Sequence, residues 1–235
     1  MQGLSVGVYS SPHLLQFNER LRINGEDIAD ALWCEAFAFI EQLRGDIELT
    51  YFEFTTLASF YLLKQQQPDL CLIEVGLGGR LDATNIIEPD LSILTTVDLD
   101  HQDYLGPDRE SIGREKAGVF RADKPAVIGE TDIPQSVLKY SQDIQAQLLC
   151  INTNYQYSIT DAGFHWQGVH TRLDALPLTA VPLQNIATAL TALETFLNDN
   201  IFDAAGNVPF ISVNAAKANE HGAITSTVNP APANV

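Results

Sequence analysis

The sequence contains few cysteines and no long apolar run. Its three cysteines, Cys34, Cys71 and Cys150, are odd in number, lie far apart and lack the spacing of a zinc site. This usage predicts reduced thiols in a cytoplasmic protein rather than a disulfide framework. No apolar stretch approaches the roughly 18 residues that a membrane-spanning helix needs. The first residues also lack the basic and apolar regions of an export signal, so we expect no export.

Basic residues are scarce as well. The chain has 13 Lys and Arg residues against 30 Asp and Glu residues, which gives a formal net charge of −17. A field of this sign repels phosphate backbones and anionic lipid headgroups unless a local basic patch overrides it, so general binding to nucleic acid or to a membrane surface is disfavoured. With 235 residues, of which 46% are hydrophobic, the chain can still bury a substantial core.

Apolar runs of strand length alternate with helical patterns along the first two thirds of the chain. The candidate strands are Val6 to Tyr9, Leu70 to Val75, Leu91 to Val97, Ala126 to Ile128 and Leu148 to Ile151. Helical spacing covers Ala31 to Leu43, with Asp30 as the expected N-cap, and Phe52 to Gln66. The alternation predicts an α/β protein with a doubly wound, mainly parallel sheet.

The pattern changes after residue 154. Alternating residues from Tyr155 to Leu173 predict a small antiparallel hairpin, and Ile186 to Leu197 predicts a further helix. Beyond Asn198 the sequence is rich in Asn, Ala, Gly, Ser, Thr and Pro and shows little periodicity. We therefore expect one partial domain over residues 1–197, followed by a linker or poorly ordered tail over residues 198–235.

Polar residues follow three of the predicted strands. Ser11 follows the first strand, Glu74 ends the second, and His101 lies beyond the third among three aspartates, Asp98, Asp100 and Asp103. In open α/β sheets ligands bind outside the carboxyl ends of the strands, and this oxygen-rich set suits magnesium or manganese. The alternative is structural: turn and capping residues, with Glu74 held in an ion pair.

A glycine-rich loop, Gly76 to Gly79, follows the second strand. Its position is typical of a dinucleotide-binding loop, but only eleven residues separate Gly79 from Leu91, too few for a loop and a crossover helix. Leu81 also replaces the third glycine of that motif. The sequence therefore argues against a dinucleotide site here.

Basic residues concentrate in one short stretch, which contains Arg109, Arg114, Lys116, Arg121 and Lys124. This stretch predicts either a local anion site or a solvated helix face. The spacing of Ile112, Lys116, Val119 and Phe120 places the lysine on the packing face of its helix, where the alternative is an ordinary lysine whose stem packs while its amine reaches water.

Five motifs, in order, resemble the bifunctional dihydrofolate synthase/folylpolyglutamate synthases, which are Mur-ligase-type enzymes. The motifs are residues 8–14 with Glu19-Arg20, residues 50–56 (TYFEFTT), residues 74–85 (EVGLGGRLDATN), Asp100-His101, and residues 113–118 (GREKAG). The resemblance extends from about Gly7 to about Leu197. It implies an ATP-dependent amide ligase of folate metabolism. Such an enzyme phosphorylates the carboxylate of dihydropteroate or a folate, and the amine of L-glutamate then attacks the acyl phosphate.

The resemblance also implies roles for individual residues. Ser11 and Glu74 would bind one Mg²⁺ ion, whereas His101 and a carbamylated Lys116 would bind a second, and Glu74, His101 and Lys116 would be catalytic. Asn185 would contact ATP. The pterin substrate would lie against two segments, with Phe52 stacking on its ring and Asp82 accepting hydrogen bonds from it; these segments comprise Thr50, Tyr51, Phe52 and Glu53, and Leu81, Asp82 and Ala83. The expected partners are ATP, dihydropteroate or folate, and L-glutamate, and we expect a monomer.

Two parts of the family pattern are missing. The family's nucleotide loop, G-x-x-x-x-G-K-[ST], would precede the first strand, yet the dipeptide Gly-Lys occurs nowhere in this chain. The smaller C-terminal domain of the family is also missing. We therefore expect a ligase fragment that is inactive alone. The alternatives are another Mur-type amino-acid ligase, against which the pterin-type segments argue, and a non-catalytic pterin- or nucleotide-binding module.

Overall fold

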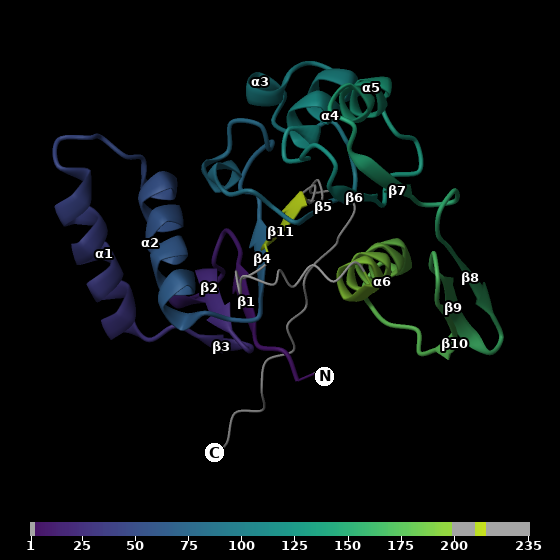
Figure 1. Ribbon diagram of the computed structural model, residues 1–235, viewed down its shortest axis with the longest axis horizontal. Coiled ribbons are helices and arrows are strands. Elements are labelled where there is room, and N and C mark those ends of the chain that lie inside the picture. The colour runs from purple at the N-terminus through teal and green to yellow at the C-terminus, as the bar shows by residue number, and fades with distance from the viewer. Residues whose placement is uncertain (1–2, 199–209, 215–235) are drawn as a thin grey trace.

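The computed structural model describes residues 3–198 and 210–214, whose strands form two sheets (Figure 1). The larger sheet has eight strands in the order β3-β2-β1-β4-β11-β5-β6-β7. Their bounds are β1 Val6–Tyr9, β2 Leu21–Ile23, β3 Glu26–Asp27, β4 Leu70–Glu74, β5 Leu91–Leu94, β6 Pro125–Ile128, β7 Gln147–Cys150 and β11 Phe210–Asn214. The six strands from β1 to β7 in this order are parallel, and β2 and β3 add an antiparallel edge. The predicted mainly parallel sheet is therefore confirmed.

The helices are α1 Asp30–Arg44, α2 Tyr51–Gln66, α3 Gln102–Leu105, α4 Arg109–Ala117, α5 Gln135–Asp143 and α6 Leu183–Asn198, with 3₁₀ turns at Phe17–Arg20 and Ala83–Ile86. Helices α1, α2, α4 and α6 lie at predicted places, whereas α3 and α5 were not predicted. The expected N-cap of α1 is wrong. Helix α1 begins at Asp30 itself, and its cap position is Ala29, which makes no side-chain capping bond. The Asp30 carboxylate instead accepts a hydrogen bond from Asn18 Nδ2 at 2.8 Å.

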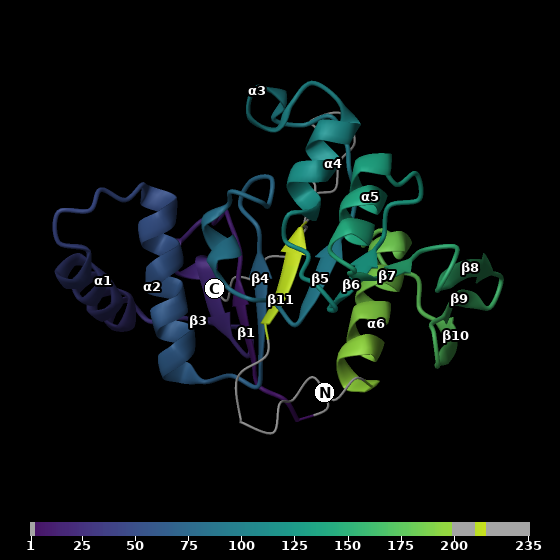
Figure 2. The ribbon, with the colours of Figure 1, turned by 45° about the horizontal axis from the view of Figure 1, so that its top comes forward.

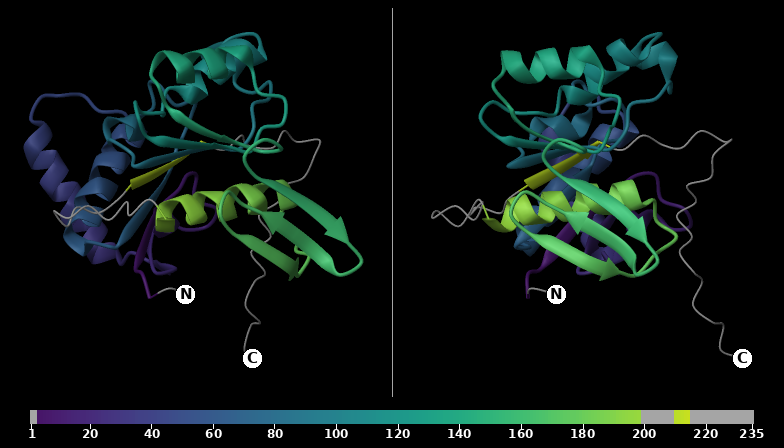
Figure 3. Two further views of the ribbon diagram at one scale, coloured as in Figure 1. Left: turned by 45° about the vertical axis from the view of Figure 1, so that its right-hand side comes forward. Right: turned by 90° about the vertical axis from the view of Figure 1, so that its right-hand side faces the viewer.

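Helices cover both faces of the main sheet (Figures 2 and 3). On β4, Cys71 and Ile73 pack with α1 and α2, whereas Leu70 and Leu72 point to the opposite face and pack with α6. Leu94 and its neighbours on β6 pack under α4 and α5. Helices α1, α2, α4 and α5 thus form one layer and α6 lies on the other side, as a doubly wound sheet requires. Among the described residues, no helix is long and apolar enough to cross a membrane.

The predicted hairpin is a three-stranded antiparallel sheet. Its strands are β8 Gln156–Thr160, β9 Gly163–Gln167 and β10 Arg172–Leu176, in the order β10-β9-β8. The turn between β9 and β10 is fixed to α6 by Glu194, which is 7% exposed. Its carboxylate accepts hydrogen bonds from the backbone N–H groups of residues 169, 170 and 171 at 2.5–3.0 Å. This turn brings a third strand back onto β9, and the predicted hairpin, which ended at Leu173, contained only the first two residues of that strand.

Strand β11 lies within the segment predicted to be a linker or tail. It pairs in parallel with β4 on one side and β5 on the other, so Phe210–Asn214 is a central strand and the tail prediction is wrong for these five residues. The other residues from 199 onward lie outside the described part of the chain, and the domain boundary at residue 197 stays a prediction.

Candidate functional site

The carboxyl ends of the parallel strands bring the predicted site residues to one edge of the sheet. Strands β1 and β4 run side by side with Tyr9 opposite Ile73, so the residues that follow them are neighbours. The Ser11 backbone N–H donates to Glu74 Oε2 at 3.1 Å, and Ser11 is only 9% exposed. Ser11 and Glu74, which are 63 residues apart in sequence, therefore meet as the sequence predicts.

The glycine-rich loop packs closely against other parts of the site. A Cβ atom at Gly79 would lie 2.8 Å from the Glu115 carbonyl oxygen and 2.9 Å from that of Lys116, so this loop approaches the end of α4. A Cβ atom at Gly76 would lie 2.5 Å from the ring of Phe52. Between this loop and β5 lies only the 3₁₀ turn Ala83–Ile86. The geometry thus agrees with the argument against a dinucleotide loop, because no crossover helix follows the glycines.

Asp82 fixes the conformation of the same loop. Its carboxylate accepts hydrogen bonds from the Leu77 N–H at 2.8 Å and from the N–H and hydroxyl of Thr84 at 2.9 and 2.6 Å. Leu81 beside it is 79% exposed, and Ala83 is half-buried. The three predicted pterin contacts in this segment therefore lie together, and the carboxylate of Asp82 accepts hydrogen bonds from its own loop.

The second predicted pterin segment begins α2. Thr50 and Glu53 form a reciprocal capping box, with the Thr50 N–H 2.7 Å from Glu53 Oε2 and the Glu53 N–H 3.2 Å from Thr50 Oγ1. These bonds lower the pKa of Glu53. Tyr51 is 62% exposed, and its ring lies 5.4 Å from the Arg20 guanidinium. Phe52 is half-buried against Gly76, which brings this segment to the glycine-rich loop.

Lys116 is the buried cation of the site. It is 5% exposed, and its Nζ donates to Asn214 Oδ1 at 2.9 Å. The Asn214 amide also donates to the carbonyl oxygens of Gly78 and Lys116. Burial lowers the pKa of Lys116 to about 8, and the charge of Asp100 partly opposes this shift. Lys116 is therefore held between α4, the glycine-rich loop and β11.

His101 lies on the loop that follows β5. It precedes α3 with a left-handed backbone, and its half-exposed ring places Nε2 3.6 Å from Asp100 Oδ1. Because Asp100 also acts electrostatically on Lys116, the His101 loop and the end of α4 face the same region.

The other cations of the basic stretch do not form an anion site. Arg109 binds the Val97 carbonyl and Asp132, and Arg114 lies 3.8 Å from the centre of the Tyr140 ring. Arg121 donates to several carbonyl groups and to Glu88, and Lys124 pairs with Asp90. Of the five basic residues, only Lys116 is held at the candidate site, so the contacts of the other four do not favour the anion-site alternative.

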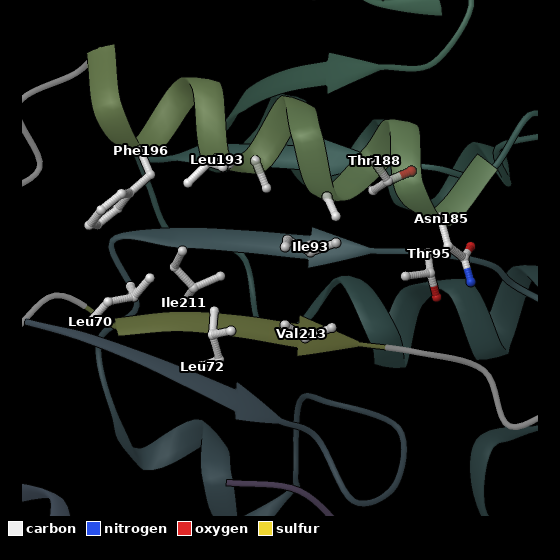
Figure 4. A pocket seen from close by; sticks show the side chains of 12 residues that line it. Leu70, Leu72, Ile93, Thr95, Asn185, Thr188, Leu193, Phe196, Ile211 and Val213 are labelled. Atoms are coloured by element: carbon white, nitrogen blue, oxygen red, sulfur yellow. The ribbon is translucent and has the colours of Figure 1, made fainter. Parts of the chain in front are cut away.

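Asn185 lies at one end of an apolar pocket between α6 and the sheet (Figure 4). The pocket has a volume of about 270 Å³ and is lined from β4, β5, β11 and α6. Figure 4 shows Asn185 beside Thr95, just after the carboxyl end of β5, and Phe196 near the opposite end. The neighbouring Gln184 donates to the Gly129 carbonyl at 2.6 Å, which ties the start of α6 to the end of β6.

The sequence of this chain is similar to those of known proteins. The chain is 50% identical over 191 residues to "Dihydrofolate synthase/folylpolyglutamate synthase" of Escherichia coli (strain K12), and 45% identical over 192 residues to the protein of the same name from Haemophilus influenzae. Over the matched stretch, this chain is a homologue of dihydrofolate synthase/folylpolyglutamate synthase. The two matches cover 81% and 82% of this chain but 45% and 44% of the relatives. The chain thus spans a little under half the length of these synthases.

Solved structures of these synthases have the same fold. "E.coli FolC in complex with DHPP and ADP" has a TM-score of 0.80 at 50% identity and covers 82% of this chain and 46% of its own. The synthase from Yersinia pestis "complexed with AMPPNP and Mn ion" has a TM-score of 0.78 at 54% identity, with 82% and 47% covered. A scan against protein-family models finds no match.

The predicted site residues lie in separate groups rather than in one cluster. Ser11 contacts Glu74, Lys116 contacts Asn214, and Asn185 stands apart at the pocket on the other face of the sheet. Within residues 3–198 and 210–214, no three His, Cys, Asp or Glu side chains converge as a ready metal site. The predicted metal ligands therefore share an edge of the sheet without forming a closed coordination shell.

Sequence reasoning missed Asn214. It is 1% exposed and supplies the hydrogen-bond partner of Lys116. The one available signal was the short apolar-polar alternation of Phe210 to Asn214, which is weak within a stretch rich in small and polar residues. Asn214 also lies beyond Leu197, where the synthase resemblance ends.

Proposed function

We propose that this chain carries part of the active site of an ATP-dependent ligase that joins L-glutamate to dihydropteroate or a folate. The contact between Ser11 and Glu74 supports this proposal most directly. It brings the backbone of a serine beside a carboxylate at the carboxyl edge of the sheet, and the hydroxyl and carboxylate oxygens that these two residues carry are ligands that a hard cation prefers. The relatives with about 50% identity carry the name of this activity.

In the proposed reaction, a carboxylate oxygen of the folate substrate attacks the γ-phosphorus of ATP and releases ADP. The amine of glutamate then attacks the acyl carbon of the acyl phosphate, and inorganic phosphate leaves as the amide forms. The first step brings a carboxylate toward a triphosphate, so the site must neutralise negative charge. The two divalent cations proposed below would supply this positive charge.

Ser11 and Glu74 fit one divalent cation. Both lie at one strand edge, and Glu74 is half-buried, so its charge is poorly screened by water. A bound Mg²⁺ or Mn²⁺ would offset charge on the transferring phosphoryl group. The solved relative with AMPPNP and a Mn ion supports a nucleotide and a divalent metal.

A second cation would use His101 and Lys116, the latter as a carbamate. Carbamylation joins the neutral amine to carbon dioxide with loss of one proton, and it turns a cation into an anionic oxygen ligand. The lowered pKa of Lys116 favours the neutral amine. In the arrangement described above, however, Lys116 donates to Asn214, so carbamylation requires that this hydrogen bond be given up.

The substrates would bind around these groups. Asn185, at the end of the apolar pocket, is the proposed ATP contact. The pterin ring would lie beside Phe52 and the loop of Leu81, Asp82 and Ala83, flanked by Thr50, Tyr51 and Glu53. Relatives solved with DHPP and with L-glutamate support a folate-like substrate and the amino acid.

A non-catalytic folate- or nucleotide-binding module is the second candidate. The observation that favours it is the amide partner of Lys116, which ties up the only cation of the basic stretch that is held at the site. Binding of dihydropteroate or ADP without ligation would be its signature.

The test is a chimera in which residues 7–197 of this chain replace the matched stretch of the E. coli relative. We expect the chimera to release phosphate only when dihydropteroate and glutamate are both present. Glu74→Gln and His101→Ala should each reduce turnover at least 100-fold with little change in thermal midpoint, because glutamine keeps the shape of Glu74 but removes its charge.

Glu41→Gln provides the matched control, since Glu41 is an exposed carboxylate on α1. The proposal fails if the chimera folds but shows no substrate-dependent turnover, or if Glu74→Gln retains full activity. For the 235-residue chain by itself we expect no ligation, and turnover by a preparation free of host ligase would contradict that expectation.

A further inference from the structure

The loop that carries His101 leaves the sheet from a residue whose backbone is held on both sides. This residue is Val97, which follows β5 and is 2% exposed. Its N–H donates to Glu130 Oε2 at 2.8 Å, and its carbonyl accepts a hydrogen bond from Arg109 Nε at 2.9 Å. Glu130 follows β6 and Arg109 begins α4, so two other segments fix the start of the loop.

The two residues that hold Val97 belong to one network. Arg109 Nη2 lies 3.5 Å from Glu130 Oε2, the oxygen that binds Val97. Both residues also bind Asp132: its N–H donates to Glu130 Oε1 at 3.0 Å, and its carboxylate and carbonyl accept from Arg109. Glu130 is 8% exposed, and a buried carboxylate is costly unless a cation and hydrogen-bond donors accompany it. Each of the two residues thus keeps the other in place.

The other end of the same loop is held by α3. The N–H groups of Tyr104 and Leu105 donate to the His101 carbonyl at 2.9 and 3.0 Å, and Leu105 packs in the same core cluster as Val97. His101 itself has a φ of 49°, in the left-handed region that few residues other than glycine adopt. Because only three residues separate Val97 from His101, a loop held at both ends leaves His101 few conformations.

We infer that Arg109 and Glu130 are positioning residues that set the place of His101 at the edge of the sheet. They act through the backbone of Val97, and both lie outside the five motifs of the synthase resemblance. Residues that orient a metal ligand from behind typically contribute about 10- to 100-fold to metal affinity or activity. The inference rests on the proposed function for what His101 does there, but the placement of His101 is measured in the chain itself.

The experiment compares the full 235-residue chain with Arg109→Met by amide hydrogen exchange, followed by NMR. We expect the N–H groups of Tyr104 and Leu105, which bind the His101 carbonyl, to exchange about tenfold faster in the variant, because the loop opens more often. Leu72, whose strand lies inside the sheet, should change by less than about twofold.

Three further variants separate positioning from general stability. Arg44→Met is the matched control and should not affect the His101 loop, because Arg44 also pairs with a carboxylate and donates to a loop carbonyl, but on α1. Arg109→Lys should not rescue Arg109→Met, since an ammonium cannot reproduce the fork of bonds that the guanidinium makes. Glu130→Gln should raise the exchange less, because its amide oxygen can still accept from Val97. As the milder change, it decides by the same readings if Arg109→Met does not fold.

A second measurement reports the position of the imidazole, with Mn²⁺ alone as the probe, because this paramagnetic ion broadens the NMR signals of nearby nuclei. We expect Mn²⁺ to broaden the His101 ring signals of the unmodified chain, and Arg109→Met to require about tenfold more Mn²⁺ for the same broadening. In the chimera, Arg109→Met should lower kcat about tenfold and change the KM for dihydropteroate by less than about twofold, since the proposed pterin segments lie on other loops.

The inference is overturned if Arg109→Met changes the exchange at Tyr104 and Leu105 by less than about twofold, or if Leu72 exchanges faster by the same factor, which would show a general loosening. It is also overturned if Mn²⁺ broadens the His101 signals of the chain and of the variant at the same concentration. If Mn²⁺ broadens the His101 signals of neither protein, the metal site of the proposed function fails, and the exchange rates alone decide whether Arg109 positions His101.

Discussion

The contribution of the buried Lys116 to the stability of this chain should become more favourable as the pH rises above neutrality. Burial lowers its pKa from 10.5 to about 8 in the folded state. Between these two values the unfolded chain binds more protons than the folded one, so the free energy of unfolding increases with pH. From the two pKa values, the ammonium costs the folded state about 3 kcal/mol at pH 7 and about 1 kcal/mol at pH 10. We therefore expect the stability of the chain minus that of a variant without this amine to increase by about 2.5 kcal/mol from pH 7 to pH 10.

The assay is urea unfolding of the unmodified chain and of Lys116→Met at pH 7, 8, 9 and 10. Loss of the hydrogen bond to Asn214 shifts the variant by a constant amount, so only the change with pH reports the amine. Lys64→Met, which removes an exposed lysine on α2, corrects for the change in net charge. The reasoning is refuted if the stability difference between the chain and Lys116→Met stays constant within about 0.5 kcal/mol over this range. If the stability of the chain minus that of Lys116→Met instead decreases with pH, the folded state holds the proton more tightly than the unfolded state.

Three substitutions test the contacts that hold the site's framework together. Glu194→Ala should destabilise the chain by about 2–4 kcal/mol in urea unfolding, since three backbone N–H groups lose a charged acceptor, and Glu194→Gln should cost less. Gly79→Ala should lower stability by about 1–3 kcal/mol, because its Cβ atom would lie 2.8 Å from the Glu115 carbonyl oxygen; a neutral effect would contradict the close packing. Tyr155→Phe should cost about 1–2 kcal/mol, because the hydroxyl donates to the buried Ile128 carbonyl at 2.9 Å, and an unchanged urea midpoint would argue against that bond.

Most of the fold could be predicted because its strands are buried on both faces. Strand β1 has the predicted bounds Val6–Tyr9, β4 and β6 differ from the predicted runs by one residue at one end, and β7 is shifted from its predicted run by one residue. A parallel strand covered by helices on both sides must be apolar throughout, which makes it visible as a continuous run. The strand predicted to end at Val97 stops at Leu94, because β11 and β6 end there and the following backbone turns toward Glu130.

Strand β11 could not be predicted because what makes it a strand is its pairing with β4 and β5, and the local sequence does not reveal that pairing. Phe210–Asn214 is only five residues long and lies far along the chain from both pairing partners. Its inclusion in the sheet follows from the gap between β4 and β5, which is a tertiary property. The composition around it, rich in small and polar residues, favours a linker when it is considered locally.

The site could be predicted where it follows from strand order and not where it follows from side-chain geometry. Ser11 and Glu74 meet because parallel neighbouring strands end at one edge, which the sequence pattern already implies. The partner of Lys116 was inaccessible to the same reasoning, since Asn214 lies 98 residues away in the unpredicted strand.

The basic stretch shows why composition is a weak guide to an anion site. Five cations within sixteen residues look like a cluster, but a helix and the loops after it send their side chains in different directions. The guanidinium groups of Arg109 and Arg121 donate hydrogen bonds to backbone carbonyl groups of neighbouring loops, so these two side chains hold the loops in place. Lys116 alone combines burial with a position at the strand edge. Charge is available for chemistry where the fold both leaves it unpaired by another charge and brings it to the strand edge, and along this stretch Lys116 meets both conditions, since its hydrogen-bond partner is a neutral amide.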